Sequence, residues 1–444
     1  MTKWSLGYQL LKYYVGTIFR LFNKRLVANG LENIPKKKPI IFAPNHQNAL
    51  IDPLAIIFTS SKQPVFLTRA DVFAKPILLK IFTYIKMLPV YRIKDGAANL
   101  KNNEYIFNKS VEILEANAPI GLFPEATQTD KRRLRTLKKA VPRIAFMAEE
   151  KNDFNLDLQV IPVGIYYDNY YHSNVDIFVN YGKGFTIKKY KERYLENPQK
   201  AYTEFREELF DRIVELIIHI RDLEHYNVYE NMRLFYRSSM KKKLKLGNSV
   251  YDNFKTDKET IAIAEKAFLD GDSNIEVFDN QYNRLERGLK KKGFSILDFD
   301  HICPVKTIAS SLLLIFAFPI FLFGFLNAIP YYLLTLKFVK KLKTRQFDSS
   351  FKFGISAFVF PIMFMIHALI FGLITGQAIW GVYYFFAALI STVVANKYRY
   401  LFIKVKKQWA VLFLKWFKNK EFNSIIKTRD SILSFLNTAF GMDN

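Results

Sequence analysis

One histidine and one carboxylate stand close together in the stretch FAPNHQNALIDPLAI, residues 42–56. His46 and Asp52 have five residues between them, a spacing that does not place two side chains on one face of a helix. Pro53 is favoured at the first position of a helix, with Asp52 before it as the N-cap. We therefore expect a strand over PIIFAP, a turn over NHQNALI and a helix over PLAIIFTS. In a turn, the two side chains can meet.

A neutral imidazole beside a carboxylate is the general-base half of a catalytic triad. The carboxylate holds one ring nitrogen in its N–H form, and the other nitrogen can take a proton from a hydroxyl. The sequence has no GxSxG motif to supply a serine nucleophile. The hydroxyl is therefore expected to belong to a substrate, so that an acyl group passes directly from donor to acceptor. The alternative is that Asp52 is only a helix cap and His46 only a turn residue.

Short apolar runs alternate with helical patterns over residues 39–190, which predicts an α/β domain with its chemistry at the strand ends. The six expected strands are residues 39–44, 64–68, 87–92, 119–124, 158–167 and 175–182. Residues 4–28 mix apolar and basic side chains and predict a helix lying in a membrane interface, with an ordinary amphipathic surface helix as the alternative. Residues 200–300 carry many charges at helical spacing and predict a helical region.

Two long stretches without charge follow, at residues 307–336 and 353–396. Runs of this length are typical of segments embedded in a membrane. The second run is long enough for two spans that turn near GLITGQ. The first is expected to form a re-entrant hairpin bent at Pro319 or at NAIP, with a single tilted span as the alternative.

The chain is basic, with 65 Lys and Arg against 40 Asp and Glu and a net charge of +25. Basic residues flank both apolar runs, and such flanks favour the cytoplasmic side. With these runs present, the positive charge predicts attraction to acidic lipid headgroups rather than to nucleic acid. We expect an integral membrane protein whose catalytic domain faces the cytoplasm. The one cysteine, Cys303, allows no intrachain disulfide, and without paired metal-ligand spacings no metal is expected.

A second stretch, GLFPEATQTDKRRLRTLKKA at residues 121–140, follows a predicted strand and ends in a basic, helix-like run. With the His–Asp turn, it resembles the glycerolipid acyltransferase superfamily, whose members carry His–Asp in a first block and FPEG-type residues in a third. LPVYRIKDG (88–96) and VIPVGIYY (160–167) look like the second and fourth blocks, in the correct order. The resemblance covers roughly residues 30–190. The common spacing has four residues between His and Asp, and this chain has five. This longer spacing resembles that of a branch containing fungal-type glycerol-3-phosphate and dihydroxyacetone-phosphate acyltransferases.

The resemblance implies a role for each matching residue. His46 would be the general base and Asp52 its orienting partner, while Pro162 would help form the wall on the acyl side. The acceptor's phosphate would be held, and the site shaped, by Arg92 and the loop of Glu125, Ala126, Thr127 and Gln128. Backbone N–H groups near the turn or the third block are expected to stabilise the oxyanion.

The third block departs from its common ending, Gly-Thr-Arg, because this chain has Ala126, Thr127 and Gln128. A charged contact to phosphate is worth about 1.5–3 kcal/mol, so we expect another cation to replace the missing arginine. The candidates for this replacement cation are Lys131, Arg132, Arg133 and Lys138.

These expectations divide the chain into five parts. They are an interfacial amphipathic helix over 1–29, an α/β acyltransferase domain over 30–195, a helical region over 196–303, membrane hairpins over 304–407 and a C-terminal amphipathic tail over 408–444.

The implied activity is transfer of a fatty acyl group from acyl-CoA or acyl carrier protein to lysophosphatidic acid or glycerol 3-phosphate, with membrane lipids as partners and no cofactor beyond the acyl thioester. The alternatives are an acyltransferase for another lysolipid or an aminolipid, which Gln128 favours, and a non-catalytic lipid-binding membrane protein.

Overall fold

The structure is a computed structural model that describes residues 1–91, 102–170, 174–268, 273–300, 302–340, 347–417 and 420–442. The chain forms two compact units, one of residues 1–219 with 342–353 and one of residues 220–341 with 354–444. The boundary predicted at residue 195 is therefore wrong. Helix α8, Pro198–Val214, belongs to the first unit because its buried side chains, such as Phe205 and Leu209, join the hydrophobic core of that unit.

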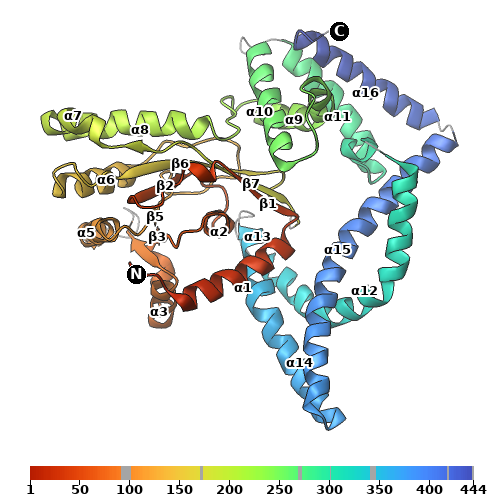
Figure 1. The fold of residues 1–444 in the computed structure, drawn as a ribbon. Helices are drawn as coiled ribbons and strands as arrows, with labels where there is room; N and C mark the ends of the chain where they lie inside the picture. Colours follow the sequence, from red (N-terminus) through yellow and green to blue (C-terminus); the bar gives the residue numbers. More distant parts are fainter. Residues whose placement is uncertain are drawn as a thin grey trace. The chain divides into compact units, whose positions relative to one another are not determined.

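The first unit is built on a mixed sheet with eight strands in the described part of the chain (Figure 1). All six predicted strands form, and β1 and β8 were not predicted. The strands are β1 Arg25–Asn29, β2 Ile40–Pro44, β3 Val65–Arg69, β4 Met87–Val90, β5 Ile120–Gly121, β6 Gln159–Tyr167, β7 Asp176–Tyr181 and β8 Phe185–Thr186. Their order is β1-β7-β6-β2-β5-β3-β4, with β8 paired to β6.

Strand β2 lies between β5 and β6, and all three run parallel. Ile41 of β2 pairs with Ile120 on one side and with Val160 on the other. The carboxyl ends of parallel strands meet at one edge of a sheet, which is where such folds place their ligands. The segments that follow β2 and β5, and the end of β6, are therefore brought together.

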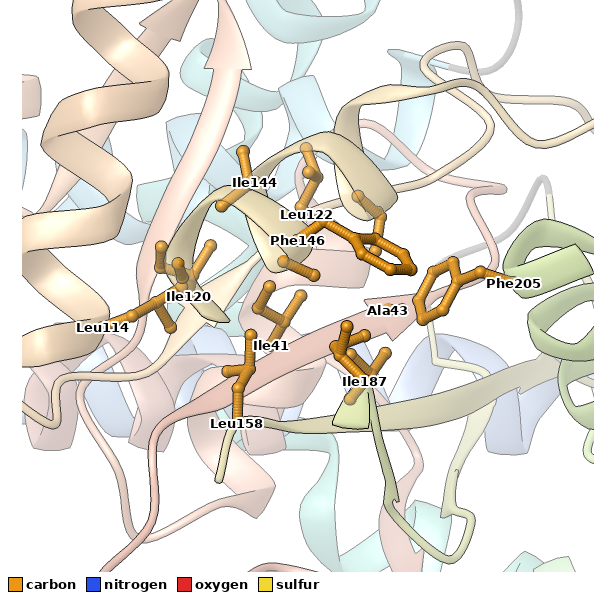
Figure 2. Close-up of a cluster of buried hydrophobic side chains, with 14 of the residues drawn as sticks. Ile41, Ala43, Leu114, Ile120, Leu122, Ile144, Phe146, Leu158, Ile187 and Phe205 are labelled. Atoms are coloured by element: carbon orange, nitrogen blue, oxygen red, sulfur yellow. The ribbon is translucent and has the colours of Figure 1, made fainter. Parts of the chain in front are cut away.

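The two faces of the sheet are covered by different helices. Ile41 and Ala43 face a core closed by α5 (Asn102–Glu115), α6 (Ala140–Lys151) and α8, where Phe146 and Phe205 are fully buried (Figure 2). The intervening Phe42 points to the opposite face and packs on Tyr181. Alternation along β2 thus buries both faces, as expected for a strand inside an α/β domain.

The N-terminal helix is shorter than predicted. Helix α1 covers Leu6–Phe22, with Ser5 as its N-cap. Residues 25–29, expected to continue the helix, instead form β1 and pair with β7, and Arg25 bonds the buried carboxylate of Asp176. Helix α1 buries Phe19 and leaves Leu10 exposed, a pattern that suits either of the two interpretations. Its interfacial position stays a prediction.

The other short elements of the first unit lie between the strands or after them. They are η1 Leu31–Asn33, α2 Ile51–Thr59, η2 Ala70–Phe73, α3 Pro76–Tyr84, η4 Lys188–Tyr190 and α7 Lys191–Glu196. Helix α13, Asp348–Gly354, adds its residues up to Phe353 to this unit.

The second unit is helical in its described residues, as predicted for residues 200–300. Its elements are α9 Tyr226–Lys243, α10 Val250–Ala267, α11 Ser273–Lys291, η5 Ile296–Phe299, α12 Pro304–Val339, the π-helical η7 Ile355–Val359, α14 Phe360–Thr375, α15 Ala378–Trp416 and α16 Lys420–Ala439. A buried ion pair between Arg233 and Asp257 joins α9 to α10.

Among the residues that the structure describes, three helical segments are long and apolar enough to cross a membrane, at 304–339, 348–375 and 378–416. The re-entrant hairpin predicted for residues 307–336 is wrong, because α12 continues through both Pro319 and Pro330. Proline is tolerated inside membrane helices when neighbouring groups satisfy the freed carbonyls. The turn predicted near GLITGQ is confirmed at Gly376, whose φ of +68° ends α14. Helix α15 runs past residue 407, so the tail does not begin there.

Candidate active site

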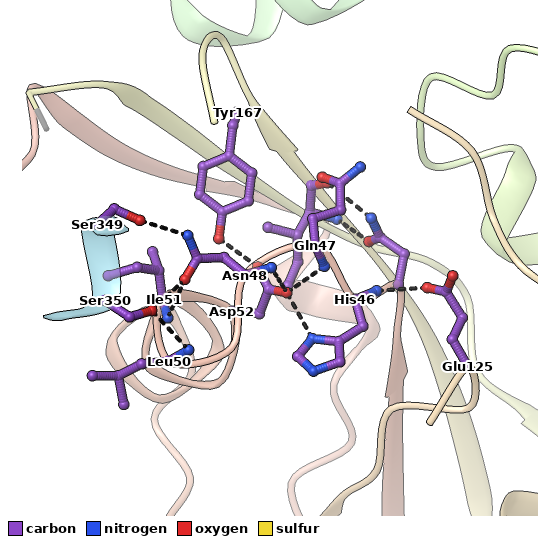
Figure 3. Close-up of polar contacts among 12 residues, drawn as sticks. His46, Gln47, Asn48, Leu50, Ile51, Asp52, Glu125, Tyr167, Ser349 and Ser350 are labelled. Atoms are coloured by element: carbon purple, nitrogen blue, oxygen red, sulfur yellow. Dashed lines mark hydrogen bonds and ion pairs between the residues drawn. The ribbon is translucent and has the colours of Figure 1, made fainter. Parts of the chain in front are cut away.

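His46 and Asp52 meet in the turn that follows β2 (Figure 3). His46 Nδ1 lies 2.9 Å from Asp52 Oδ2. Helix α2 begins at Ile51, two residues earlier than predicted, so Asp52 lies in its first turn and is not the N-cap. The Asp52 carboxylate instead reaches back over the turn, where Oδ2 accepts the N–H groups of Gln47 and Asn48 at 2.6 and 2.7 Å. The predicted contact between histidine and carboxylate therefore forms.

The second oxygen of Asp52 accepts a hydrogen bond from the hydroxyl of Tyr167, at the end of β6. Asp52 is fully buried, so these donors replace water around its charge. Burial, together with the adjacent Asp52 carboxylate, raises the pKa of Tyr167 well above its ordinary value. The hydroxyl of Tyr167 thus stays protonated and acts as the hydrogen-bond donor to Asp52. No role for Tyr167 was predicted from the sequence. Tyr167 is the last residue of a predicted strand, β6, which pairs in parallel with β2.

The loop after β5 encloses His46. The ring of Phe123 stacks on the imidazole with 4.0 Å between ring centroids. Glu125 Oε1 accepts the His46 N–H at 2.6 Å, and the Thr129 N–H donates to the His46 carbonyl at 3.1 Å. Only 13% of the His46 side chain is exposed, and its Nε2 has no hydrogen-bond partner among the described residues. The first and third blocks thus form one site, with one ring nitrogen left for a substrate.

The predicted residues of the third block lie on both sides of a tight turn. Glu125 is buried, and its Oε2 accepts the Arg135 N–H at 2.8 Å. Ala126 has a φ of +59°, a left-handed conformation that costs an L-residue about 1–2 kcal/mol and explains why glycine suits this position. Thr127 is exposed and accepts a hydrogen bond from Arg135 Nη1 at 2.8 Å, while Gln128 is half-buried.

The basic run after the third block is not helical before Ala140, where α6 begins. Arg132 is buried, donates to the Tyr167 carbonyl at 2.8 Å, and places its guanidinium over the ring of Tyr166. It is therefore unsuited to hold a phosphate, contrary to its place among the predicted cations. Lys131 and Lys138 are exposed. Arg135, which was not predicted, donates directly to Thr127 of the third block.

The remaining predicted residues are less informative. Arg92 lies outside the described residues, so its role stays a prediction. Pro162 is buried inside β6 opposite Ala43, and its role on the acyl side stays a prediction as well. In the described parts of the chain, no group of three His, Cys, Asp or Glu side chains is placed to hold a metal ion.

The backbone N–H groups of the turn are already used. Those of His46, Gln47 and Asn48 donate to carboxylates, so the turn cannot provide the expected oxyanion donors from these residues. The N–H groups of Thr127 and Gln128 have no acceptor among the described residues. The third block is therefore the better candidate for stabilising an oxyanion.

Glu125 gives the site a dependence on pH. Burial raises the pKa of Glu125 from 4.5 to about 8, although the N–H groups of Arg135 and His46 oppose the shift. Between these two values the folded protein holds a proton that the unfolded chain releases. The contribution of Glu125 to stability should therefore fall as pH rises from about 4.5 to about 8. Denaturant midpoints measured across this range are expected to show a shallower decline in Glu125→Gln than in wild type, and identical slopes would contradict the assignment.

Comparisons with known proteins find similarity to acyltransferases. Residues 25–166 match the family model Acyltransferase. The chain is 25% identical over 181 residues to a 1-acyl-sn-glycerol-3-phosphate acyltransferase of Borreliella burgdorferi, a match that covers 39% of this chain and 66%, just under two thirds, of that relative. It is also similar to the crystal structure of the 1-acyl-sn-glycerophosphate (LPA) acyltransferase PlsC from Thermotoga maritima, with 19% identity, a TM-score of 0.35, and coverage of 47% of this chain and 78% of that one.

The first unit of this protein thus has a mixed α/β fold with a mostly parallel sheet, and residues 25–166 of it are similar to the Acyltransferase family.

Proposed function

We propose that this protein is a membrane O-acyltransferase that moves a fatty acyl group from an acyl thioester, acyl-CoA or acyl carrier protein, to a glycerophosphate acceptor. The acceptor is lysophosphatidic acid or glycerol 3-phosphate. The observation that carries the proposal is the 2.9 Å contact between His46 Nδ1 and Asp52 Oδ2, with Nε2 left for a substrate. The similarity to a 1-acyl-sn-glycerol-3-phosphate acyltransferase supports it.

The proposal gives each group a role that the geometry supports. Asp52 accepts the Nδ1–H of His46, so that Nε2 takes the proton from the acceptor hydroxyl as its oxygen attacks the thioester carbonyl. The tetrahedral intermediate then collapses, the carbon–sulfur bond breaks, and the thiolate receives the proton from His46. The buried negative charge of Asp52 stabilises the imidazolium formed between these steps. Asp52 itself keeps its charge throughout.

Recognition of the acceptor's phosphate is proposed for the third block. Arg135 holds the side chain of Thr127 on the exposed side of this loop. A guanidinium on this side of the loop suits a phosphate, and the Thr127 and Gln128 N–H groups are left for the oxyanion. Arg135 would then replace the arginine that the block lacks at Gln128. Arg92 remains a further candidate for the same contact.

The membrane location is proposed from the three long apolar helices. They would keep the catalytic unit beside the bilayer that supplies a lysolipid acceptor and receives the product. The basic segment at residues 337–345 adjoins residues of the catalytic unit and predicts that this unit faces the cytoplasm.

A panel of acceptors tests the proposal. The full-length protein in lipid nanodiscs should acylate lysophosphatidic acid or glycerol 3-phosphate, with radiolabelled acyl-CoA or acyl carrier protein as donor. A lyso-aminolipid without phosphate should react at least about tenfold more slowly, because it lacks the charged contacts of the third block. Preference for the phosphate-free acceptor would assign the chain to another lysolipid. Absence of transfer to every acceptor with both donors would contradict enzymatic function.

A further inference from the structure

Two serines from the far end of the sequence contact the turn that carries His46 and Asp52 (Figure 3). The 347–353 segment belongs to the first unit, and its residues from 348 onward form the N-terminal end of the second candidate membrane helix. Asn48 Nδ2 donates to Ser349 Oγ at 2.7 Å, and the Ser350 hydroxyl donates to Asn48 Oδ1 at 2.6 Å. Ser350 Oγ also accepts the Leu50 N–H at 3.2 Å. Both polar ends of the Asn48 side chain are therefore bonded to this segment.

Asn48 links these serines to the catalytic pair. Its backbone N–H donates to Asp52 Oδ2, the same oxygen that contacts His46. Its Oδ1 also accepts the Ile51 N–H at 3.3 Å, at the start of α2. Asn48, Ser349 and Ser350 are all buried, so an unmade hydrogen bond among them would not be replaced freely by water. A change in the side chain of Asn48 would thus alter the position of the backbone N–H that donates to the Asp52 carboxylate.

An aromatic contact fixes the same segment independently of the serines. Phe353 is 1% exposed and packs edge-on against Phe19 and Phe22 of α1, with ring centroids 5.4 and 5.5 Å apart. Phe19 in turn packs on Phe58 of α2. The 347–353 segment is therefore held at both of its ends, by hydrogen bonds to the turn and by aromatic packing under α1.

We propose that Ser349 and Ser350 are positioning residues for the His46–Asp52 pair, so that the N-terminal end of the second candidate membrane helix sets the geometry of the catalytic turn. This inference rests on the proposed function for its effect on rate. Its structural part, the holding of the turn through Asn48, is independent of that function.

Hydrogen exchange measured by mass spectrometry on the full-length protein tests the structural part. In the Ser349→Ala/Ser350→Ala variant, the peptide that covers residues 45–52 should exchange about tenfold faster, because the Gln47 and Asn48 N–H groups lose their fixed acceptor. Peptides from α6 should exchange as in wild type. Adding the two serine changes to Asn48→Ala should produce only a small further increase, from the Leu50 N–H that loses Ser350 Oγ. Unchanged exchange at 45–52, or an increase that adds fully to that of Asn48→Ala, would overturn the proposal.

Acyl-transfer kinetics test the effect on the site. The double serine variant is expected to lose about 10- to 100-fold in kcat with KM unchanged, because a small misplacement of a catalytic group is costly. Ser110→Ala is the matched control, since Ser110 is equally buried and bonds only within α5. Wild-type kcat in the serine variant, with His46→Ala inactive, would overturn this proposal and leave the proposed function intact. Full activity in His46→Ala would overturn the proposed function, whereas the exchange result would still decide the role of the serines.

Discussion

Replacement of His46 by alanine is expected to lower kcat by about 10²- to 10⁴-fold, the usual contribution of a general base. The loss should fall on kcat rather than on KM, because the proton is taken only as the hydroxyl attacks. Asp52 keeps three hydrogen-bond donors, from Gln47, Asn48 and Tyr167, so the turn should remain folded. Transfer of radiolabelled acyl groups in lipid nanodiscs measures the effect.

The chain provides a matched control for this variant. His225 contacts Asp222 with 2.8 Å between Nδ1 and Oδ2, nearly the same geometry, but lies in the second unit. His225→Ala should therefore transfer acyl groups at the wild-type rate. If His46→Ala and His225→Ala were equally active, the contact of a histidine with an aspartate would have no catalytic meaning here.

Replacement of Asp52 by asparagine is expected to lower kcat by about 10³- to 10⁴-fold. Asparagine is close in shape and can still accept hydrogen bonds from the turn. It lacks the negative charge that stabilises the imidazolium formed in the reaction. Single-turnover acyl transfer, with folding checked by circular dichroism, measures the chemical step directly.

Tyr167→Phe separates the charge of Asp52 from its surroundings. The variant removes one donor to Asp52 but retains the carboxylate and its contact with His46. Its loss of rate should therefore be much smaller than that of Asp52→Asn. Equal losses in the two variants would indicate that both act by disturbing the turn, and a folded Asp52→Asn protein with near-wild-type kcat would remove Asp52 from the mechanism.

The local pattern of the sequence was sufficient for much of the fold. Apolar runs bounded by Pro, Gly and polar residues predicted six strands, and all six form. The length of the second apolar run and the glycine at 376 predicted two helices and the turn between them. These features depend on backbone preference and hydrophobic period, which act within windows of a few turns and are readable along the chain.

Elements with competing local preferences were predicted less well. Residues 25–29 were expected to be helical because they follow an amphipathic pattern, but pairing with β7 and the bond from Arg25 to Asp176 make them a strand. The prolines of α12 suggested a break, whereas the helix is continuous. For residues 25–29 the neighbouring strand decided the outcome, and that strand lies too far along the sequence to be inferred from local residues.

The sequence by itself determined that His46 and Asp52 share one turn, because both follow the same strand within a few residues. Tertiary structure alone decided what surrounds them. The topology brings the end of β6 beside β2, which gives Asp52 the hydroxyl of Tyr167. The burial of Arg132, the stacking of Phe123 and the bonds from Asn48 to Ser349 and Ser350 also join residues far apart along the chain. Such contacts depend on how strands and helices pack, so no local pattern records them.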